Sequence, residues 1–205
     1  RNIRRNMQLK YCLPTISTPT KTLTAPQTAS LSSHPASPGA LPLDIEVTAA
    51  FGDDGALTLC YRVNGKPDDL RLPTPLPPGP ADGLWQHTCC EAFVKEGGVA
   101  YREFNFSPSG QWAVYRFTDY RERDDAFTPD TEPQLGFTPL ADGFELRASL
   151  PAALLPPGSS LQIGLTAVIE ASDGSKSYWA LAHCTALPDF HVRQSFTLTL
   201  KRNTP

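Results

Sequence analysis

The chain has 205 residues, of which 40% are hydrophobic and 19% are charged, a balance typical of one soluble globular domain. Its 21 prolines exclude a bundle of long helices, because proline fixes φ and lacks an amide hydrogen. No apolar stretch approaches the ~20 residues of a membrane-spanning helix, so we expect no membrane partner.

The formal net charge is −3, and the positive charges gather at the start of the chain. Five basic residues precede Asp44, the first acidic residue, so the rest of the chain is more acidic than the whole. An acidic surface repels phosphate backbones. We therefore expect no nucleic-acid partner.

Residues 1–40 differ in composition from the rest of the chain. Between Thr15 and Ser37, 11 of 23 residues are Ser or Thr, and few large apolar side chains are present. This composition predicts a disordered basic tail. We interpret it as a solvated linker or translated upstream sequence, with a transit peptide as the alternative. A secretory signal is rejected because Pro14 and Thr15 interrupt the apolar stretch that it would need.

The five cysteines, at positions 12, 60, 89, 90 and 184, favour a reducing compartment. Their number is odd, and the adjacent pair at 89 and 90 cannot form an ordinary disulfide. No two have the C-x₂₋₄-C spacing of a structural zinc site, so we interpret them as structural thiols. Together with the absence of a secretory signal, they predict a cytoplasmic protein.

From residue 41 onward the hydrophobic period is two, which is the side-chain period of a half-buried strand. The pattern predicts a hairpin from strands near residues 43–48 and 57–63, joined by the turn sequence Gly-Asp-Asp-Gly. Residues 64–83 contain six prolines and three glycines, which predict a long surface loop with little strand pairing.

Strand patterns resume after this loop. Eight further strands are predicted near residues 84–95, 99–106, 111–117, 135–140, 143–149, 160–170, 176–182 and 194–201. A helical turn is expected only over residues 150–155, and no βαβ crossover is visible. We therefore predict an all-β protein, an antiparallel β-sandwich of about ten strands over residues 41–201, between a disordered N-terminal tail and a short C-terminal tail at 202–205.

Aromatic and hydrogen-bonding side chains recur on several predicted strands. Alternation places Trp85 and Glu91 on one face of their strand, and it places Glu103 and Asn105 on the face opposite Phe104. An aromatic ring can pack on the C–H patch of a sugar while neighbouring polar groups bind its hydroxyls. The candidate ligand-binding residues are Trp85, Glu91, Glu103, Asn105, Trp112, Tyr115, Arg116, Tyr178, Trp179 and His183.

Three segments of the chain resemble DOMON-like domain proteins of bacteria, which are relatives of the family 9 carbohydrate-binding modules. They are WQHTCCEAF at 85–93, YREFNFSPSGQWAVY at 101–115, and YWALAH at 178–183 with PDFH at 188–191. The resemblance covers residues 41–201. It implies a β-sandwich that binds sugars or, in other branches, haem, and it implies no hydrolytic machinery within the domain.

The resemblance also implies roles for particular residues. In the sugar-binding modules a Trp stacks on the sugar and a Glu six residues on binds it, and the matching pair here is Trp85 and Glu91. Trp112 and Trp179 are both candidates for a second stacking residue. No cofactor is expected, although structural calcium and a haem site made from the histidines at 87, 183 and 191 remain alternatives.

Two other functions compete with ligand binding. Glu91 and Glu103 could act as acid and base of a glycosidase, but no nucleophile elbow or oxyanion-hole signature supports an enzyme. Alternatively, the aromatic residues fill the core of a structural or protein-interaction module. We favour a non-catalytic domain that binds a small carbohydrate on one sheet face.

Overall fold

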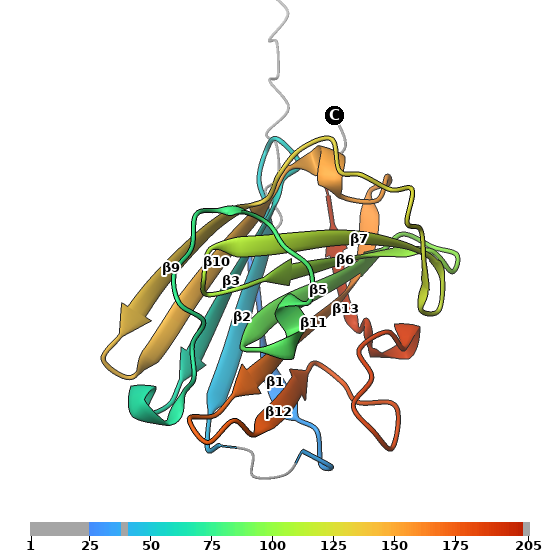
Figure 1. Cartoon of the computed structure of the whole chain (residues 1–205). Helices are drawn as coiled ribbons and strands as arrows, with labels where there is room; N and C mark the ends of the chain where they lie inside the picture. The colour runs from blue at the N-terminus through green and yellow to red at the C-terminus, as the bar shows by residue number, and fades with distance from the viewer. Residues whose placement is uncertain (1–24, 38–40, 203–205) are drawn as a thin grey trace, which may run out of the picture.

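The computed structural model describes residues 25–37 and 41–202, and this part of the chain is almost entirely β-structure (Figure 1). The all-β class is therefore confirmed. The strands are β1 (Gln27–Ser33), β2 (Asp44–Phe51), β3 (Leu57–Asn64), β4 (Gly79–Pro80), β5 (Cys89–Lys95), β6 (Tyr101–Phe106), β7 (Gln111–Asp119), β8 (Glu122–Arg123), β9 (Gln134–Leu140), β10 (Gly143–Leu150), β11 (Ser160–Glu170), β12 (Lys176–Ala180) and β13 (Leu198–Lys201). Four one-turn 3-10 helices accompany them: η1 (Pro67–Asp69), η2 (Leu84–Gln86), η3 (Ala152–Leu154) and η4 (Arg193–Ser195).

The strands form two layers that share β1. The first layer has the order β1-β2-β3-β10-β9, and the second has the order β4-β7-β6-β5-β11-β12. β8 pairs with β7, and β13 pairs with β11. The first five residues of β1 pair with β2 and its last two pair with β12, so the layers are joined into one curled sheet (Figure 1).

The core lies between the layers and is built by strand alternation. In β2, Ile45, Val47 and Ala49 point inward and are buried, while Asp44 and Glu46 face solvent. The second layer contributes residues such as Cys90, Phe104 and Leu165 to the same core. Period-two patterning therefore places one apolar row of each strand in a shared interior.

The second layer differs from the first because its outer face is also largely covered. β5 is buried along nearly its whole length. A second hydrophobic cluster on this outer face includes Phe93, Tyr101, Phe117 and Phe196, and Phe190 of the C-terminal loop packs against it. Chain segments that are distant in sequence thus cover part of the outer face of the second layer. A pocket can form between this face and the covering segments.

The structure corrects the predicted start of the folded domain. β1 lies inside the segment expected to be disordered, and its Leu31 is buried in the core. The Ser- and Thr-rich composition misled the prediction because β1 is held by backbone pairing to β2 and β12 more than by apolar side chains. Residues 1–24 and 38–40 of the predicted tail lie outside the described residues. At the other end, the Arg202 amide donates to the Ser159 carbonyl, so the folded part includes one residue more than predicted.

Other boundaries also differ from the prediction. Residues 84–88 are not strand: Gly83, with φ of 70°, leads into η2, and β5 begins only at Cys89. The last strand begins at Leu198 rather than 194. The two-residue strand β4, at the edge of the second layer, pairs with β7 in parallel, whereas only antiparallel pairing was predicted. The single helical turn expected near residue 152 is present as η3.

Among the described residues, no helix has the length and hydropathy of a membrane-spanning segment.

Candidate ligand-binding pocket

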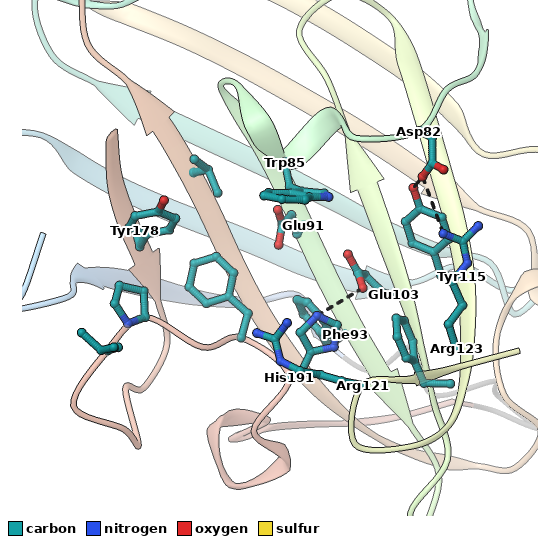
Figure 2. A pocket seen from close by; sticks show the side chains of 15 residues that line it. Asp82, Trp85, Glu91, Phe93, Glu103, Tyr115, Arg121, Arg123, Tyr178 and His191 are labelled. Atoms are coloured by element: carbon teal, nitrogen blue, oxygen red, sulfur yellow. Dashed lines mark hydrogen bonds and ion pairs between the residues drawn. The ribbon is translucent and has the colours of Figure 1, made fainter. Parts of the chain in front are cut away.

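A pocket of about 550 Å³ opens on the outer face of the second layer (Figure 2). Strands β5, β6, β7 and β11 form its floor, and its walls come from η2, the β7–β8 turn, β8, β12 and the loop before η4. Its charged and hydrogen-bonding lining residues are Asp82, Glu91, Glu103, Tyr115, Arg121, Arg123 and His191. The volume lies within the range of ~300–1,000 Å³ that is usual for small-ligand sites.

Strand register brings the two glutamates of the floor together. Glu91 of β5 lies opposite Asn105 of β6, and Phe93 lies opposite Glu103. Glu91 and Glu103 are therefore diagonal neighbours, and they share the outer face because each strand alternates with a period of two. Figure 2 shows both carboxyl groups in the middle of the pocket.

Both carboxyl groups are deeply buried, with 2% of Glu91 and 5% of Glu103 exposed. Glu103 accepts a hydrogen bond of 2.8 Å from the Asn105 amide. Glu91 accepts one of 3.2 Å at Oε2 from the Thr166 hydroxyl, but its Oε1 has no hydrogen-bond partner in the protein. Burial raises the pKa of Glu103 to about 7, because the charged form loses solvation. Burial and the neighbouring Glu103 together raise the pKa of Glu91 well above its usual range.

His191 stands beside Glu103 as a neutral imidazole. The Tyr101 hydroxyl accepts a hydrogen bond from the Arg121 amide and is hydrogen-bonded to Nδ1 of His191, at 2.8 Å. The other ring nitrogen, Nε2, faces Glu103 Oε2 at 3.7 Å. Burial lowers the pKa of His191 to about 4, so this contact is not a charged ion pair near neutral pH.

Two arginines at the pocket edge are already paired with carboxylates. Arg121, which has a positive φ of 54° in the β7–β8 turn, lies 2.9 Å from Asp189. Arg123 lies 3.7 Å from Asp82 and 3.4 Å from Asp125. Its guanidinium also stacks over the Tyr115 ring at 4.2 Å. These ion pairs neutralise the positive charge at this edge.

Aromatic rings form the opposite side of the pocket. Trp85 in η2 is 53% exposed, whereas most large apolar residues of the second layer are buried. The Tyr178 ring of β12 lies across the pocket from the arginines (Figure 2) and contacts Phe190, with a centroid separation of 6.1 Å. An uncovered indole next to buried carboxyl groups combines an apolar flat surface with strong hydrogen-bonding groups.

The structure brings half of the predicted site residues to this pocket. Trp85, Glu91, Glu103, Tyr115 and Tyr178 line it. Asn105 is completely buried behind them and holds the Glu103 carboxyl by the hydrogen bond described above.

The other four predicted residues lie elsewhere, and their placement corrects the prediction. Trp112 and Trp179 belong to the core between the layers, because they have the opposite parity to Tyr115 and Tyr178 in their strands. Arg116 shares the parity of Trp112 and pairs with Asp124. His183 is bonded through Nε2 to the Ser32 carbonyl, at 2.8 Å, outside the pocket.

The sequence prediction missed several residues that line the pocket from outside the predicted strands. Asp82, Arg121 and Phe190 lie in loops and turns, and Arg123 lies in the two-residue strand β8. His191 was not among the predicted ligand-binding residues, although the segment PDFH that contains it was part of the resemblance.

The candidate cofactor ligands have hydrogen-bond partners within the protein. Among the described residues, no group of three or more His, Cys, Asp or Glu side chains is arranged to hold a metal ion. Asp54 accepts a hydrogen bond within its own turn, and Asp124 pairs with arginine. His87 is bonded through Nδ1 to Glu170 at 2.7 Å, and His183 is bonded through Nε2 to a backbone carbonyl. Met7 lies outside the described residues.

The fold and the pocket define a two-layer β-sandwich with a concave site on the outer face of one sheet. Solved structures share this architecture. A candidate carbohydrate-binding protein from Bacteroides uniformis ATCC 8492 aligns with a TM-score of 0.65 and 17% identity over 85% of each chain. A family 9 carbohydrate-binding module from Caldicellulosiruptor kristjanssonii, in complex with cellotriose, aligns with a TM-score of 0.52 and 12% identity over 84% of this chain and 82% of that one.

The same kind of module in complex with glucose aligns equally well, with a TM-score of 0.52 and 12% identity over 84% of this chain and 83% of that one. No family model matches the sequence, and no curated protein matches it. At these identities the likeness is one of fold, and the chain therefore has a fold like that of the family 9 modules.

Proposed function

We propose that the protein is a non-catalytic module that binds a small carbohydrate in this pocket. The observation that carries the proposal is the exposed Trp85 ring beside the buried carboxyl groups of Glu91 and Glu103. A sugar ring has an apolar C–H face and a rim of hydroxyls, so it can stack on the indole while the carboxyl groups bind its hydroxyls.

The structural neighbours support this assignment. Two of them contain cellotriose or glucose, and the other is a candidate carbohydrate-binding protein. The resemblance of residues 85–93 to sugar-binding modules points to the same tryptophan and glutamate that line the pocket. The proposal includes neither haem nor calcium, and it involves no nucleic acid or membrane.

Binding without hydrolysis is supported by the structural neighbours, two of which are carbohydrate-binding modules in complex with a saccharide.

Isothermal titration with glucose, cellotriose and a panel of other mono- and oligosaccharides tests the proposal. We expect a dissociation constant below about 1 mM for at least one of them, and loss of that binding in Trp85→Ala. Leu76→Ala is the matched control, because Leu76 is also a half-exposed large apolar residue but does not line the pocket. The proposal is wrong if no saccharide binds more tightly than about 1 mM.

A further inference from the structure

The charges that line the pocket do not balance inside it. Arg121 and Arg123 are each paired with aspartates, as described above. Among the described residues, no lysine or arginine forms an ion pair with Glu91 or Glu103. Only His191 approaches Glu103, and its imidazole is neutral near pH 7. The two carboxyl groups on the floor of the pocket thus have no described lysine or arginine within ion-pair distance.

One carboxyl oxygen on this floor is also without a hydrogen-bond partner. Only 2% of Glu91 is exposed, yet its side chain lines the pocket, and its Oε1 accepts no hydrogen bond from the described part of the protein. A buried, unpaired polar atom costs about 1–3 kcal/mol. A ligand that donates a hydrogen bond to Oε1 would recover this cost, and a charged donor would recover more than a neutral one.

We propose that the pocket selects a protonated amino sugar over a neutral sugar, with the ammonium group bound between Glu91 and Glu103. This inference rests on the proposed carbohydrate-binding function and specifies its ligand class. An ammonium group has three donors, so it can bind both carboxyl groups, including the unpartnered oxygen of Glu91. The Trp85 and Tyr178 rings that line the pocket (Figure 2) add a cation–π attraction that a hydroxyl cannot provide.

The same geometry disfavours an acidic sugar. A sugar carboxylate would approach two glutamates, and it would have to displace Asp189 or Asp82 to reach the guanidinium groups. Bringing like charges together in a partly buried site raises the free energy of the complex. The pocket therefore distinguishes cationic, neutral and anionic sugars in that order of affinity.

Binding of an ammonium group should also release protons. In the free protein burial favours the protonated carboxyl groups, whereas a neighbouring cation favours the ionised form. The pair is faced by Asn105 of β6, Thr166 of β11, Asp82, the arginines Arg121 and Arg123, and the neutral His191. The hydroxyls of Tyr101 and Tyr115 and the buried thiols of Cys89 and Cys90 also lie near it. A neutral sugar brings no positive charge to the pair, so we expect proton release to be specific to the cationic ligand.

The test compares sugars that differ in one substituent. D-Glucose, D-glucosamine, 6-amino-6-deoxy-D-glucose and N-acetyl-D-glucosamine are titrated calorimetrically near pH 6.5, in two buffers with different ionisation enthalpies. We expect at least one amino sugar to bind about tenfold or more tightly than glucose, with proton release, whereas N-acetylglucosamine shows no such gain.

Variants assign the preference to the carboxyl groups. Glu91→Gln and Glu103→Gln keep the shape of the side chains but cannot ionise, so we expect the ratio of amino-sugar to glucose affinity to fall to about one in either variant. Glu46→Gln is the matched control, because Glu46 is an exposed glutamate of β2 on the other layer, and it should keep the wild-type ratio. Circular dichroism checks that each variant is folded, and the proton-release measurement on the wild type needs no variant.

The outcomes separate this inference from the function on which it rests. If glucose binds but neither amino sugar binds more tightly, the ammonium site is refuted while carbohydrate binding stands. If the preference exists but both glutamine variants retain it, the assignment to these carboxyl groups is wrong. If no sugar binds at all, the proposed function fails and the ligand class fails with it.

Discussion

Replacing Trp85 with alanine separates a binding role of this indole from a packing role. Trp85 is 53% exposed, whereas Trp179 is 6% exposed and belongs to the core. A fully buried aromatic ring removes about 150–250 Å² from water at about 25 cal/mol per Å², so the half-covered Trp85 should contribute about 2–3 kcal/mol to the free energy of unfolding. Trp179→Ala also leaves a cavity, and its expected loss is about 3–5 kcal/mol.

Urea unfolding followed by far-ultraviolet circular dichroism measures both losses, and titration with the best-binding saccharide measures affinity. We expect the urea midpoint of Trp85→Ala to lie closer to that of the wild type than the midpoint of Trp179→Ala does. We also expect Trp85→Ala to bind the saccharide at least tenfold more weakly than the wild type. Trp179→Ala should show the reverse, with the larger loss of stability and nearly normal affinity of the protein that remains folded. Equal losses of stability would mean that Trp85 is a packing residue, and the interpretation of the pocket as a binding site would be refuted.

Three further predictions concern stability. Because the folded protein holds the Glu103 proton up to a pKa of about 7, against an ordinary value of 4.5, ionisation of Glu103 should destabilise the fold as pH rises between these values. The loss of unfolding free energy should reach about 3 kcal/mol at pH 7 and above. Urea titrations at several pH values measure it, and Glu103→Gln should abolish this pH dependence. Tyr101→Phe should lower the free energy of unfolding by about 1–2 kcal/mol, since it leaves the partly buried Arg121 amide and an imidazole nitrogen of His191 without this partner. Leu31→Ala should lower it by about 2–4 kcal/mol, because β1 belongs to the core.

Each of these predictions has a matched control. Tyr120→Phe removes an exposed hydroxyl bond and should change stability by less than about 1 kcal/mol. Thr28→Ala alters an exposed position of β1 and should have a similarly small effect. A stability that rises between pH 4.5 and 7 in the wild type relative to Glu103→Gln would contradict the burial of that carboxyl. A Leu31→Ala protein as stable as Thr28→Ala would mean that β1 is not part of the folded domain.

Most strands could be predicted because their signal is local. A strand buried on one face must alternate apolar and polar residues, and β2, β3 and β10 do so over eight residues each. β1 could not be predicted in this way, because what orders it is pairing with two strands that lie far away in sequence. Local composition carries no information about such partners.

The site was predictable only in part, for a related reason. Alternation shows that Trp112 and Tyr115 must lie on opposite faces of β7, but it does not show which face meets the core. The structure turns Trp112 inward and Tyr115 toward the pocket. Residues of loops, such as Asp82 and His191, have no periodic signal at all, so nothing in their neighbourhood predicted their place in the lining.

The sequence by itself determined that the protein is built from short antiparallel strands and that Trp85, Glu91 and Glu103 are candidates for one surface. Those features follow from the two-residue period of the strand and from side-chain chemistry, both of which are local. Only the tertiary structure decided that the two glutamates become buried neighbours with no described lysine or arginine paired to them, that Tyr178 rather than a second tryptophan lines their pocket, and that distant loops enclose them. Burial and proximity depend on how the layers pack, and packing joins residues whose separation along the chain gives no sign of their contact.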